Sequence, residues 1–200
     1  MADLTLYHCA KTRSATILWL IEELGVPYDL VRIAVYSGES RKPEYLAINP
    51  MGKVPAIRHG DNVVADSAAI ALYLAEQYPE AKLAPGLADS LRAAYLQWMV
   101  FRTGIMEPCI TDKMKPRDGL SRGTLGWGDY ETMVSVLSTA LKKGPFLLGE
   151  QFSAADVVVG SGMAFVLTFD GLPHLPEFTS YVDRLEQRPA RQRAIAIDKD

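Results

Sequence analysis

Cysteine is scarce in this sequence, because only Cys9 and Cys109 occur among its 200 residues. Two isolated cysteines cannot form a disulfide framework, and neither belongs to a Cys-x-x-Cys pair, which excludes the usual dithiol motif of disulfide reductases. Scarce cysteine is typical of proteins that work in a reducing compartment. The sequence therefore indicates a cytoplasmic protein.

An excess of charge of one sign and a long apolar run are also missing. The formal net charge is -3 and the basic residues are scattered, which leaves no electrostatic footprint for nucleic acid. No apolar stretch reaches the roughly 20 residues of a membrane-spanning helix. The segment "MADLTLYHCA" has no basic region followed by an apolar run, so no signal peptide is expected. These absences predict a protein with neither a nucleic-acid nor a membrane partner.

Strand and helix patterns alternate in the first part of the chain. Leu4 to His8 alternates in polarity and is rich in strand-forming residues. The segment "TRSATILWLIEELGVP" then places apolar residues at helical spacing and ends at Gly25 and Pro27. The next segment, "YDLVRIAV", is extended again. Strand, helix and strand at this length predict a βαβ unit with a parallel strand pair.

A hairpin and a helix follow this unit. Lys53 to Arg58 and Asn62 to Ala65 are two short strand patterns, joined by the turn residues "HGDN". The segment "DSAAIALYLAEQYP" predicts an amphipathic helix that Asp66 or Ser67 caps and that Pro79 ends. Residues 1–80 are therefore expected to form an α/β domain.

Strand patterns nearly vanish after a linker over Pro79 to Ser90. Helical patterns cover "DSLRAAYLQWMVFRTGIMEP", "DYETMVSVLSTALKKG" and "PEFTSYVDRLEQRP". A polar, glycine-rich loop over residues 113–129 is long enough to have a function of its own. Residues 88–200 are therefore expected to form an all-helical domain.

Three consecutive valines, Val157 to Val159, favour a strand by propensity alone. Ser153 and Asp156 nevertheless stand in the Ser-x-x-Asp arrangement that satisfies free amides at a helix start. The apolar run is also too long for one ordinary strand. We expect a buried helix here, in which Asp156 has a capping role rather than a catalytic one.

The stretch "NPMGKVPAI", from Asn49 to Ile57, places a proline at the start of a strand pattern. Proline lacks an amide hydrogen, so a sheet tolerates it only at an edge, a strand start or a bulge. A group other than a neighbouring strand can therefore use the backbone of Val54. The alternative is that Pro55 only blunts an edge strand.

Four segments together resemble the successive signatures of the cytosolic glutathione transferase family. They are "LYHCAKTRSATILWLIEELGVPYDLV", "NPMGKVPAI", "DSAAIALYLAEQYP" and "FSAADV". The ordered pair of Asn-Pro-x-Gly-Lys-Val-Pro and Asp-Ser is specific, whereas either motif alone is weak. The resemblance covers nearly the whole chain, with a poor match around residues 113–129.

The resemblance implies a thioredoxin-like N-terminal domain, an all-α C-terminal domain and a two-fold homodimer. It also implies a cis peptide between Val54 and Pro55, since X-Pro bonds are the only ones that are commonly cis. The cysteinyl backbone of glutathione would then bind the Val54 N–H and C=O groups as a short extra strand.

The resemblance also implies a partner for each charge of glutathione. Ser67, at a helix start that favours an anion, would bind the γ-glutamyl carboxylate. Asp66 would face the ammonium, although relatives more often have Glu or Gln here, so this shorter side chain would need help from the partner subunit. Lys53 would meet the glycyl carboxylate, and Arg41 and Lys42 are weaker candidates for the same charge. The alternative for Asp66 and Ser67 is simple helix capping.

The group that activates the thiol is left open among several residues. A free thiol has a pKa of about 8.5, so a donor must stabilise the thiolate at neutral pH. Counted back from Gly25, Tyr7 and Arg13 fall where the tyrosine-type classes keep a hydroxyl and an arginine. Ser14 is the serine nearest to the position that serine-type classes use. Cys9 is offset from every cysteine position of the family and ranks third, after Tyr7 and Ser14.

The resemblance implies an enzyme that conjugates glutathione to small hydrophobic electrophiles in detoxification, with a glutathione-dependent peroxidase activity beside it. Glutathione would be the co-substrate, and no metal is implied. The electrophile would lie against the helical domain near Met99, Met106, Trp127 and Phe165, although core packing explains these residues equally well. The alternative is a binding or interaction protein that keeps the fold without catalysis.

Overall fold

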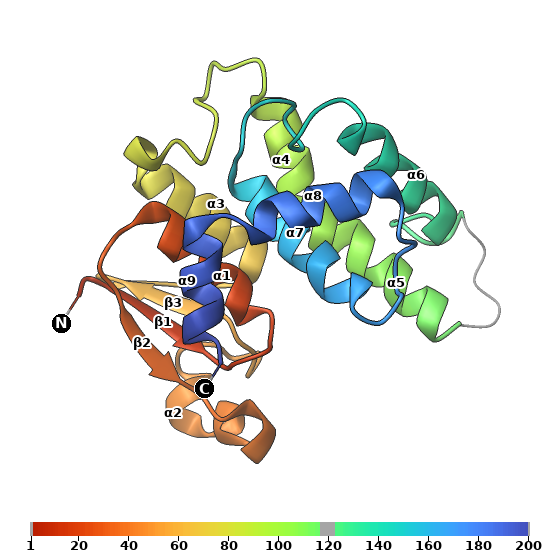
Figure 1. Cartoon of the computed structure of the whole chain (residues 1–200). Helices are drawn as coiled ribbons and strands as arrows, with labels where there is room; N and C mark the ends of the chain where they lie inside the picture. The colour runs from red at the N-terminus through yellow and green to blue at the C-terminus, as the bar shows by residue number, and fades with distance from the viewer. Residues whose placement is uncertain (1, 117–122, 200) are drawn as a thin grey trace. The chain divides into compact units, whose positions relative to one another are not determined.

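A computed structural model describes residues 2–116 and 123–199 of the chain (Figure 1). The chain forms two compact units. The first unit contains the chain up to Leu83 and from Gln187 onward, and the second contains Ala84–Glu186. The predicted polar loop over residues 113–129 falls partly on residues 117–122, which lie outside the described residues.

The first unit contains a four-stranded mixed sheet. Its strands are β1 (Leu4–His8), β2 (Asp29–Arg32), β3 (Ala56–His59) and β4 (Asn62–Ala65), in the order β2-β1-β3-β4. β1 pairs with β2 in parallel, and β3 is antiparallel to both β1 and β4. The predicted βαβ unit and the following hairpin are therefore confirmed.

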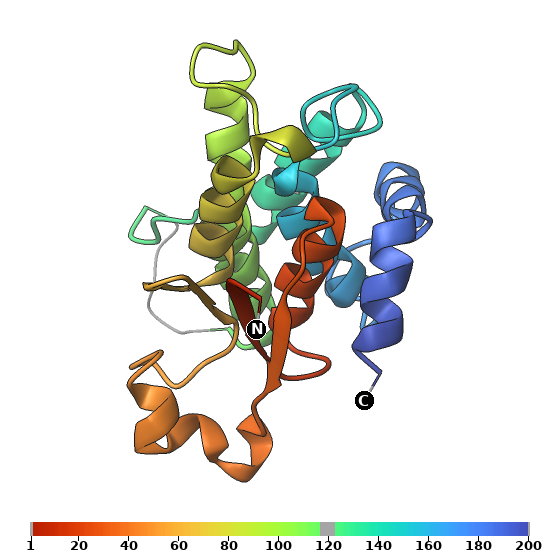
Figure 2. The same cartoon turned by 90° about the vertical axis from the view of Figure 1, so that its left-hand side faces the viewer.

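Two helices, α1 (Ser14–Leu24) and α3 (Ser67–Gln77), pack against each other and against this sheet. Short helical turns form the rest of the unit: η1 (Val35–Ser37), η2 (Glu39–Arg41), α2 (Pro43–Leu46) and η3 (Pro79–Ala81). Figures 1 and 2 show η1, η2 and α2 gathered together at one end of the sheet. This combination is the thioredoxin-like arrangement that the sequence predicts.

β3 begins at Ala56, three residues later than the predicted start at Lys53. The Val54–Pro55 peptide is cis, as the resemblance implies. Proline cannot donate to a strand ladder, so regular pairing starts only after Pro55. The residues before it form an irregular loop that belongs to the candidate site.

The long elements of the second unit are helices in its described part, with two isolated β-bridges between residues 146 and 151. It contains α4 (Arg92–Phe101), a π-helical turn (Arg102–Met106), α5 (Glu107–Met114), α6 (Tyr130–Leu141), α7 (Ala154–Leu167) and α8 (Pro176–Glu186). The π-helical turn joins α4 to α5, so the helix predicted from one long pattern is interrupted there.

The helix α7 confirms the interpretation of the valine run as a buried helix. Ser153 and Asp156 form a complete capping box at its start. Asp156 also accepts hydrogen bonds from the Leu147 amide at 2.8 Å and from the Tyr181 hydroxyl at 3.0 Å. Burial raises the pKa of Asp156 above its ordinary value, and these hydrogen bonds oppose that rise. The carboxyl group is therefore enclosed in the core of the second unit, which fits a structural role.

The helix α9 (Pro189–Ile197) is an element that the sequence patterns do not reveal. It lies along α1, as both views show (Figure 2). Arg188 binds both carboxylate oxygens of Glu23, at 2.7 and 2.8 Å, and Arg193 binds Glu22 at 2.7 Å. The chain from Gln187 onward therefore belongs to the first unit, whereas the sequence prediction included it in the helical domain of residues 88–200. That residues 1–80 and 88–200 are separate domains stays a prediction.

We predict that the Arg188–Glu23 pair stabilises the first unit more than the Arg193–Glu22 pair does. The side chain of Glu23 is only 7% exposed, and that of Arg188 is 29% exposed, so neither group is well hydrated. Arg188→Met should lower the unfolding free energy in urea by about 1.5–3 kcal/mol, the range for a lost hydrogen bond to a charged group. Arg193 is 54% exposed, and Arg193→Met is the matched control, with an expected cost below about 1 kcal/mol. Equal losses in the two variants would contradict this assignment.

Candidate functional site

The strand register brings the predicted site residues to one end of the sheet. Ala56, the first residue of β3, pairs with Tyr7 on one side and with Ala65 on the other. Val54–Pro55 immediately precedes Ala56, and Asp66–Ser67 immediately follows Ala65. Three segments that are far apart in the sequence therefore meet around Ala56.

Tyr7 lies in a small apolar cluster at this end. The buried members of the cluster are Tyr7, Ile33, Tyr45, Val54 and Ala56. The rings of Tyr7 and Tyr45 meet edge to face, with centroids 6.0 Å apart and an angle of 68° between planes. No hydrogen bond of the Tyr7 hydroxyl is found within the described residues. Its proton is therefore available to an acceptor from outside the chain.

A pair of hydrogen bonds fixes the loop before Val54. The Tyr45 hydroxyl and the Asn49 side-chain amide both donate to the carbonyl oxygen of Lys53, at 2.6 and 2.7 Å. Burial raises the pKa of Tyr45 to about 12, with a smaller effect of Tyr7, so the phenol keeps its proton. The proton of Tyr45 is committed to Lys53. Sequence reasoning missed Tyr45 and gave Asn49 no role, although Asn49 opens the quoted motif.

The same loop turns at Gly52 in a conformation that only glycine adopts easily. Its φ is +59°, and a Cβ there would lie 2.8 Å from the Ser40 carbonyl oxygen. No hydrogen bond among the described residues uses the backbone of Val54. The exposed side chain of Lys53 follows directly after this turn. The loop thus presents an unpaired stretch of backbone with a cation beside it.

Asp66 and Ser67, at the start of α3, differ in what their side chains contact. Asp66 has a left-handed φ of +76°, and its side chain accepts from the Ala68 amide at 2.9 Å and from the Ala69 amide at 3.4 Å. Ser67 is 5% exposed, and its hydroxyl has no hydrogen-bond partner in the part of the chain that is described. The capping role therefore falls to Asp66, and the hydroxyl of Ser67 remains available to a ligand.

Ser14 is fully buried, and its hydroxyl is occupied by neighbours in the chain. It lies 2.8 Å from His8 Nδ1 and 2.9 Å from the Thr12 hydroxyl. It also accepts from the Cys9 amide at 3.0 Å and lies 2.9 Å from the Cys9 carbonyl oxygen. These contacts saturate a group with one proton and two lone pairs. Ser14 therefore holds the loop between β1 and α1 rather than facing solvent.

The remaining predicted residues lie around this site with less specific contacts. Arg13 is exposed at the position preceding α1, and Lys42 is exposed at the position preceding α2. Arg41 donates to the carbonyl oxygen of Met51 at 3.2 Å, which ties η2 to the loop. Cys9 is half-buried and packs against the cluster that contains Tyr7. All four therefore lie in segments next to the candidate site.

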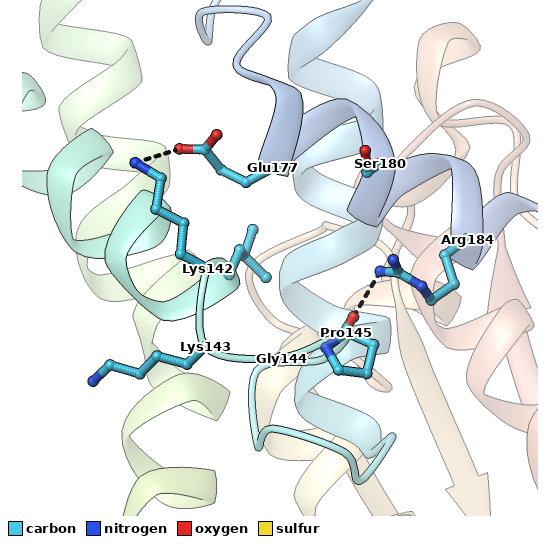
Figure 3. A pocket seen from close by; sticks show the side chains of 8 residues that line it. Lys142, Lys143, Gly144, Pro145, Glu177, Ser180 and Arg184 are labelled. Atoms are coloured by element: carbon cyan, nitrogen blue, oxygen red, sulfur yellow. Dashed lines mark hydrogen bonds and ion pairs between the residues drawn. The ribbon is translucent and has the colours of Figure 1, made fainter.

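A separate cavity of about 330 Å³ lies in the second unit, between the end of α6 and α8 (Figure 3). Two of the cations that line it are engaged: Lys142 lies 3.1 Å from Glu177, and Arg184 donates to the Pro145 carbonyl oxygen at 2.9 Å. None of the predicted site residues lines it.

Within residues 2–116 and 123–199 there is no cluster of metal-ligating side chains. No helix in those ranges is long and apolar enough to cross a bilayer.

The fold defines a chain with a thioredoxin-like unit followed by a helical unit, and known proteins share this design. Residues 2–76 match the family described as "Glutathione S-transferase, N-terminal domain". Glutathione S-transferase 1 of Dianthus caryophyllus is 44% identical over 156 residues, which are 74% of this chain and 70% of that protein. The chain therefore belongs to the glutathione S-transferase family.

Two further similar proteins, one found by its sequence and one by its structure, differ in the reaction for which they are named. A disulfide-bond oxidoreductase of Escherichia coli strain K12 is 27% identical over 206 residues, which are 95% of this chain and 93% of that protein. The crystal structure of a glutathione transferase homologue from Sulfitobacter, with bound glutathione, superposes with a TM-score of 0.79 at 29% identity, over 98% of this chain and 99% of that one. Proteins similar to this chain are therefore named for different reactions, one as a disulfide-bond oxidoreductase and one as a glutathione transferase homologue.

We predict that the hydroxyl of Ser67 is a binding group. Ser67→Ala should weaken glutathione binding about ten-fold or more, because a hydrogen bond to a charged group contributes ~1.5–3 kcal/mol. Isothermal titration calorimetry measures the affinity. Ser180→Ala, at an exposed serine of α8, is the control and should leave the affinity unchanged. An unchanged affinity in Ser67→Ala would remove this residue from the site.

Proposed function

We propose that the chain binds glutathione at the end of the sheet where Tyr7, Val54–Pro55 and Asp66–Ser67 meet. The observation that carries this proposal is the double pairing of Ala56 with Tyr7 and Ala65. It brings an unpaired backbone, a buried serine residue and a phenol to one end of the sheet. The cysteinyl backbone of glutathione would add to Val54 as a short strand, by the same pairing that sheets use internally.

The two charged ends of the tripeptide have separate partners in this proposal. The γ-glutamyl carboxylate binds the hydroxyl and amide of Ser67, where the helix dipole of α3 favours a negative charge. Asp66 faces the ammonium group, and Lys53 faces the glycyl carboxylate, with Arg41 and Lys42 as weaker alternatives. Asp66 already accepts two amides with one carboxylate oxygen, so only its other oxygen is left for the ammonium.

Tyr7 is the proposed donor to the thiolate. Its side chain belongs to the same cluster as Val54, which is where the backbone pairing would hold the cysteinyl residue. Tyr45 is excluded from this role because its proton is held by Lys53, and Ser14 is disfavoured because its hydroxyl is enclosed. Arg13 is exposed on the loop after β1 and remains the second candidate.

The reaction that follows is conjugation to a small hydrophobic electrophile, in a cytoplasmic detoxification role. The thiol proton goes to solvent, the sulfur forms a bond to an electrophilic carbon, and a leaving group such as chloride departs with the bonding electron pair. Stabilisation of the thiolate is the step that this chain's own residues can supply, since hydrogen-bond donors in a dry site lower the pKa of an acceptor thiol. A glutathione-dependent peroxidase activity would use the same thiolate.

A second candidate is glutathione-dependent reduction of a disulfide, in which two glutathione molecules are oxidised to their disulfide and the target disulfide becomes two thiols. Its support is the half-buried position of Cys9 against the Tyr7 cluster, together with a relative named as a disulfide-bond oxidoreductase. The absence of a Cys-x-x-Cys pair argues against it. A non-catalytic protein that binds glutathione would share the site and lack thiol activation.

We propose that the protein is a homodimer, in which the N-terminal domain of each subunit packs on the helical domain of the other. Exposed apolar side chains on each unit support this. Leu96 and Val100, 41% and 54% exposed, lie one turn apart on α4. In the first unit, Val63 is exposed on β4, which is an edge strand. Such surfaces are typical of faces that are covered in an assembly.

We predict that Tyr7→Phe raises the pKa of the bound glutathione thiol towards about 8.5. Conjugation at neutral pH should fall ten-fold or more with affinity nearly intact, because one pKa unit corresponds to about 1.36 kcal/mol. Thiolate absorbance against pH, with glutathione bound, measures the shift.

Ser14→Ala and Cys9→Ser are the companion variants. Cys9→Ser should leave the titration and conjugation intact, and Ser14→Ala should move the titration less than Tyr7→Phe does, because Ser14 contacts only the loop next to Tyr7. If Ser14→Ala moves it instead, the donor is not Tyr7. If Cys9→Ser abolishes all activity, disulfide chemistry replaces conjugation as the function. Glutathione that binds with an unshifted thiol pKa in the parent protein would indicate the non-catalytic alternative.

We predict a mass in solution of twice the 22.0 kDa of the chain. Multi-angle light scattering at micromolar concentration measures it directly. Val100→Glu should shift the population towards the monomer, because it places a charge on a face that the dimer would bury. A parent protein that elutes as a 22.0 kDa monomer would overturn the dimer proposal.

A further inference from the structure

The helix α9 is held to the first unit by charged contacts rather than by an apolar face. Only Ala190 and Ala194 of this helix are buried. In contrast, Arg188 and Arg193 pair with consecutive glutamates of α1, and Arg191 stacks over the Trp19 ring at 5.1 Å. Two small buried residues allow the helix to approach α1 closely, and the arginines fix its direction and position. These contacts therefore also fix the position of the residue that follows α9.

That residue is Asp198, and its carboxylate reaches the loop between β1 and α1. Its two oxygens lie 3.3 and 3.2 Å from the Lys11 amide nitrogen, which donates to them. Lys11 has a left-handed φ of +58°, a conformation that is unfavourable for a lysine unless its surroundings hold it. Asp198 thus supports the turn at its strained residue.

The same carboxylate also faces a buried histidine. His8 Nε2 lies 3.2 Å from Asp198 Oδ1, although the atoms are not aligned for a hydrogen bond. On the other side of the ring, His8 Nδ1 lies 2.8 Å from the Ser14 hydroxyl. Ser14 in turn contacts the amide and the carbonyl oxygen of Cys9. Asp198 therefore contacts the Lys11 amide and the His8 ring, and His8 in turn contacts Ser14. These contacts together hold the loop between β1 and α1.

The order Asp198, His8, Ser14 resembles a hydrolytic triad, but burial excludes that chemistry. Both His8 and Ser14 have no exposed surface, so no substrate carbonyl can reach the hydroxyl. The hydroxyl also has other partners, Thr12 and Cys9, that a nucleophile would have to give up. The network holds a loop in place.

We propose that Asp198 is a positioning residue for thiolate activation, acting through the loop that joins Tyr7 to α1. This inference rests on the proposed function, since the proposed donor, Tyr7, lies in β1 one residue before the end of that strand, where the loop begins. His8 directly follows Tyr7, and Arg13 directly precedes Ser14. A loop that loses Asp198 would loosen next to both Tyr7 and Arg13, while the binding groups at Val54 and Ser67 lie on other segments.

The test compares Asp198→Ala and Asp198→Glu with Lys199→Ala, a change at the adjacent exposed residue. In Asp198→Ala, kcat with chlorodinitrobenzene should fall on the order of ten-fold, the scale for a slightly misplaced reacting group. The affinity for glutathione should change less than about two-fold. Asp198→Glu should restore part of kcat, and Lys199→Ala should match the parent.

A readout that does not depend on catalysis accompanies these rates. Alkylation of Cys9 by iodoacetamide reports how tightly the loop is held, and Cys109 serves as an internal reference because it is buried. Burial also raises the pKa of the Cys109 thiol to about 11, which keeps it unreactive. Alkylation of Cys9 and hydrogen exchange of the amides of residues 9–13 should both accelerate in Asp198→Ala and not in Lys199→Ala.

The outcomes separate the two proposals. If loop accessibility and kcat both change while affinity holds, the positioning role is supported. If neither accessibility readout changes in Asp198→Ala, or if affinity and kcat fall together, the positioning role is overturned. If the parent protein shows no conjugation, the proposed function fails; a faster Cys9 reaction in Asp198→Ala would then still support control of the loop by Asp198, and an unchanged one would reject it.

Discussion

The interruption of strand pairing at Pro55 is the constraint on which the candidate site depends. Because proline has no amide donor, regular pairing of β3 begins at Ala56, and the backbone of Val54 stays outside the ladder. Ala56 then pairs with both Tyr7 and Ala65, so the residues beyond these partners gather at the same end of the sheet. A single residue without a donor thus brings together a free backbone segment, a phenol and a helix start.

Around this end of the sheet, most of the polar side chains hold backbone in place. Tyr45 and Asn49 bind the Lys53 carbonyl, Asp66 caps α3, and Ser14 binds both backbone groups of Cys9. The groups without hydrogen-bond partners among the described residues include the Tyr7 and Ser67 hydroxyls and the Val54 backbone. Binding a peptide-like ligand requires a rigid frame with a few unpaired groups, and this division supplies both.

Much of this could be predicted from the sequence, because the signals were local. The capping residues Ser153 and Asp156, the turn "HGDN" and the proline at position 55 act through their immediate neighbours, and the structure has them as expected. The start of β3 was placed too early, since strand propensity took no account of the missing donor. The sequence pattern does not reveal the helix α9, because the helix is short and buries only Ala190 and Ala194, so it has no apolar stripe, and because arginine pairs with α1 hold it in place. The burial of Ser14 likewise depends on His8 and Thr12, contacts that spacing alone does not show.

A crystal structure with glutathione bound tests the central claim most directly. The account predicts that the cysteinyl N–H and C=O of the tripeptide pair with the Val54 backbone and that the γ-glutamyl carboxylate meets Ser67. It also predicts a sulfur atom within roughly 3–3.5 Å of the Tyr7 hydroxyl oxygen. Glutathione bound away from Val54, or bound there with its sulfur directed away from Tyr7, would contradict the account.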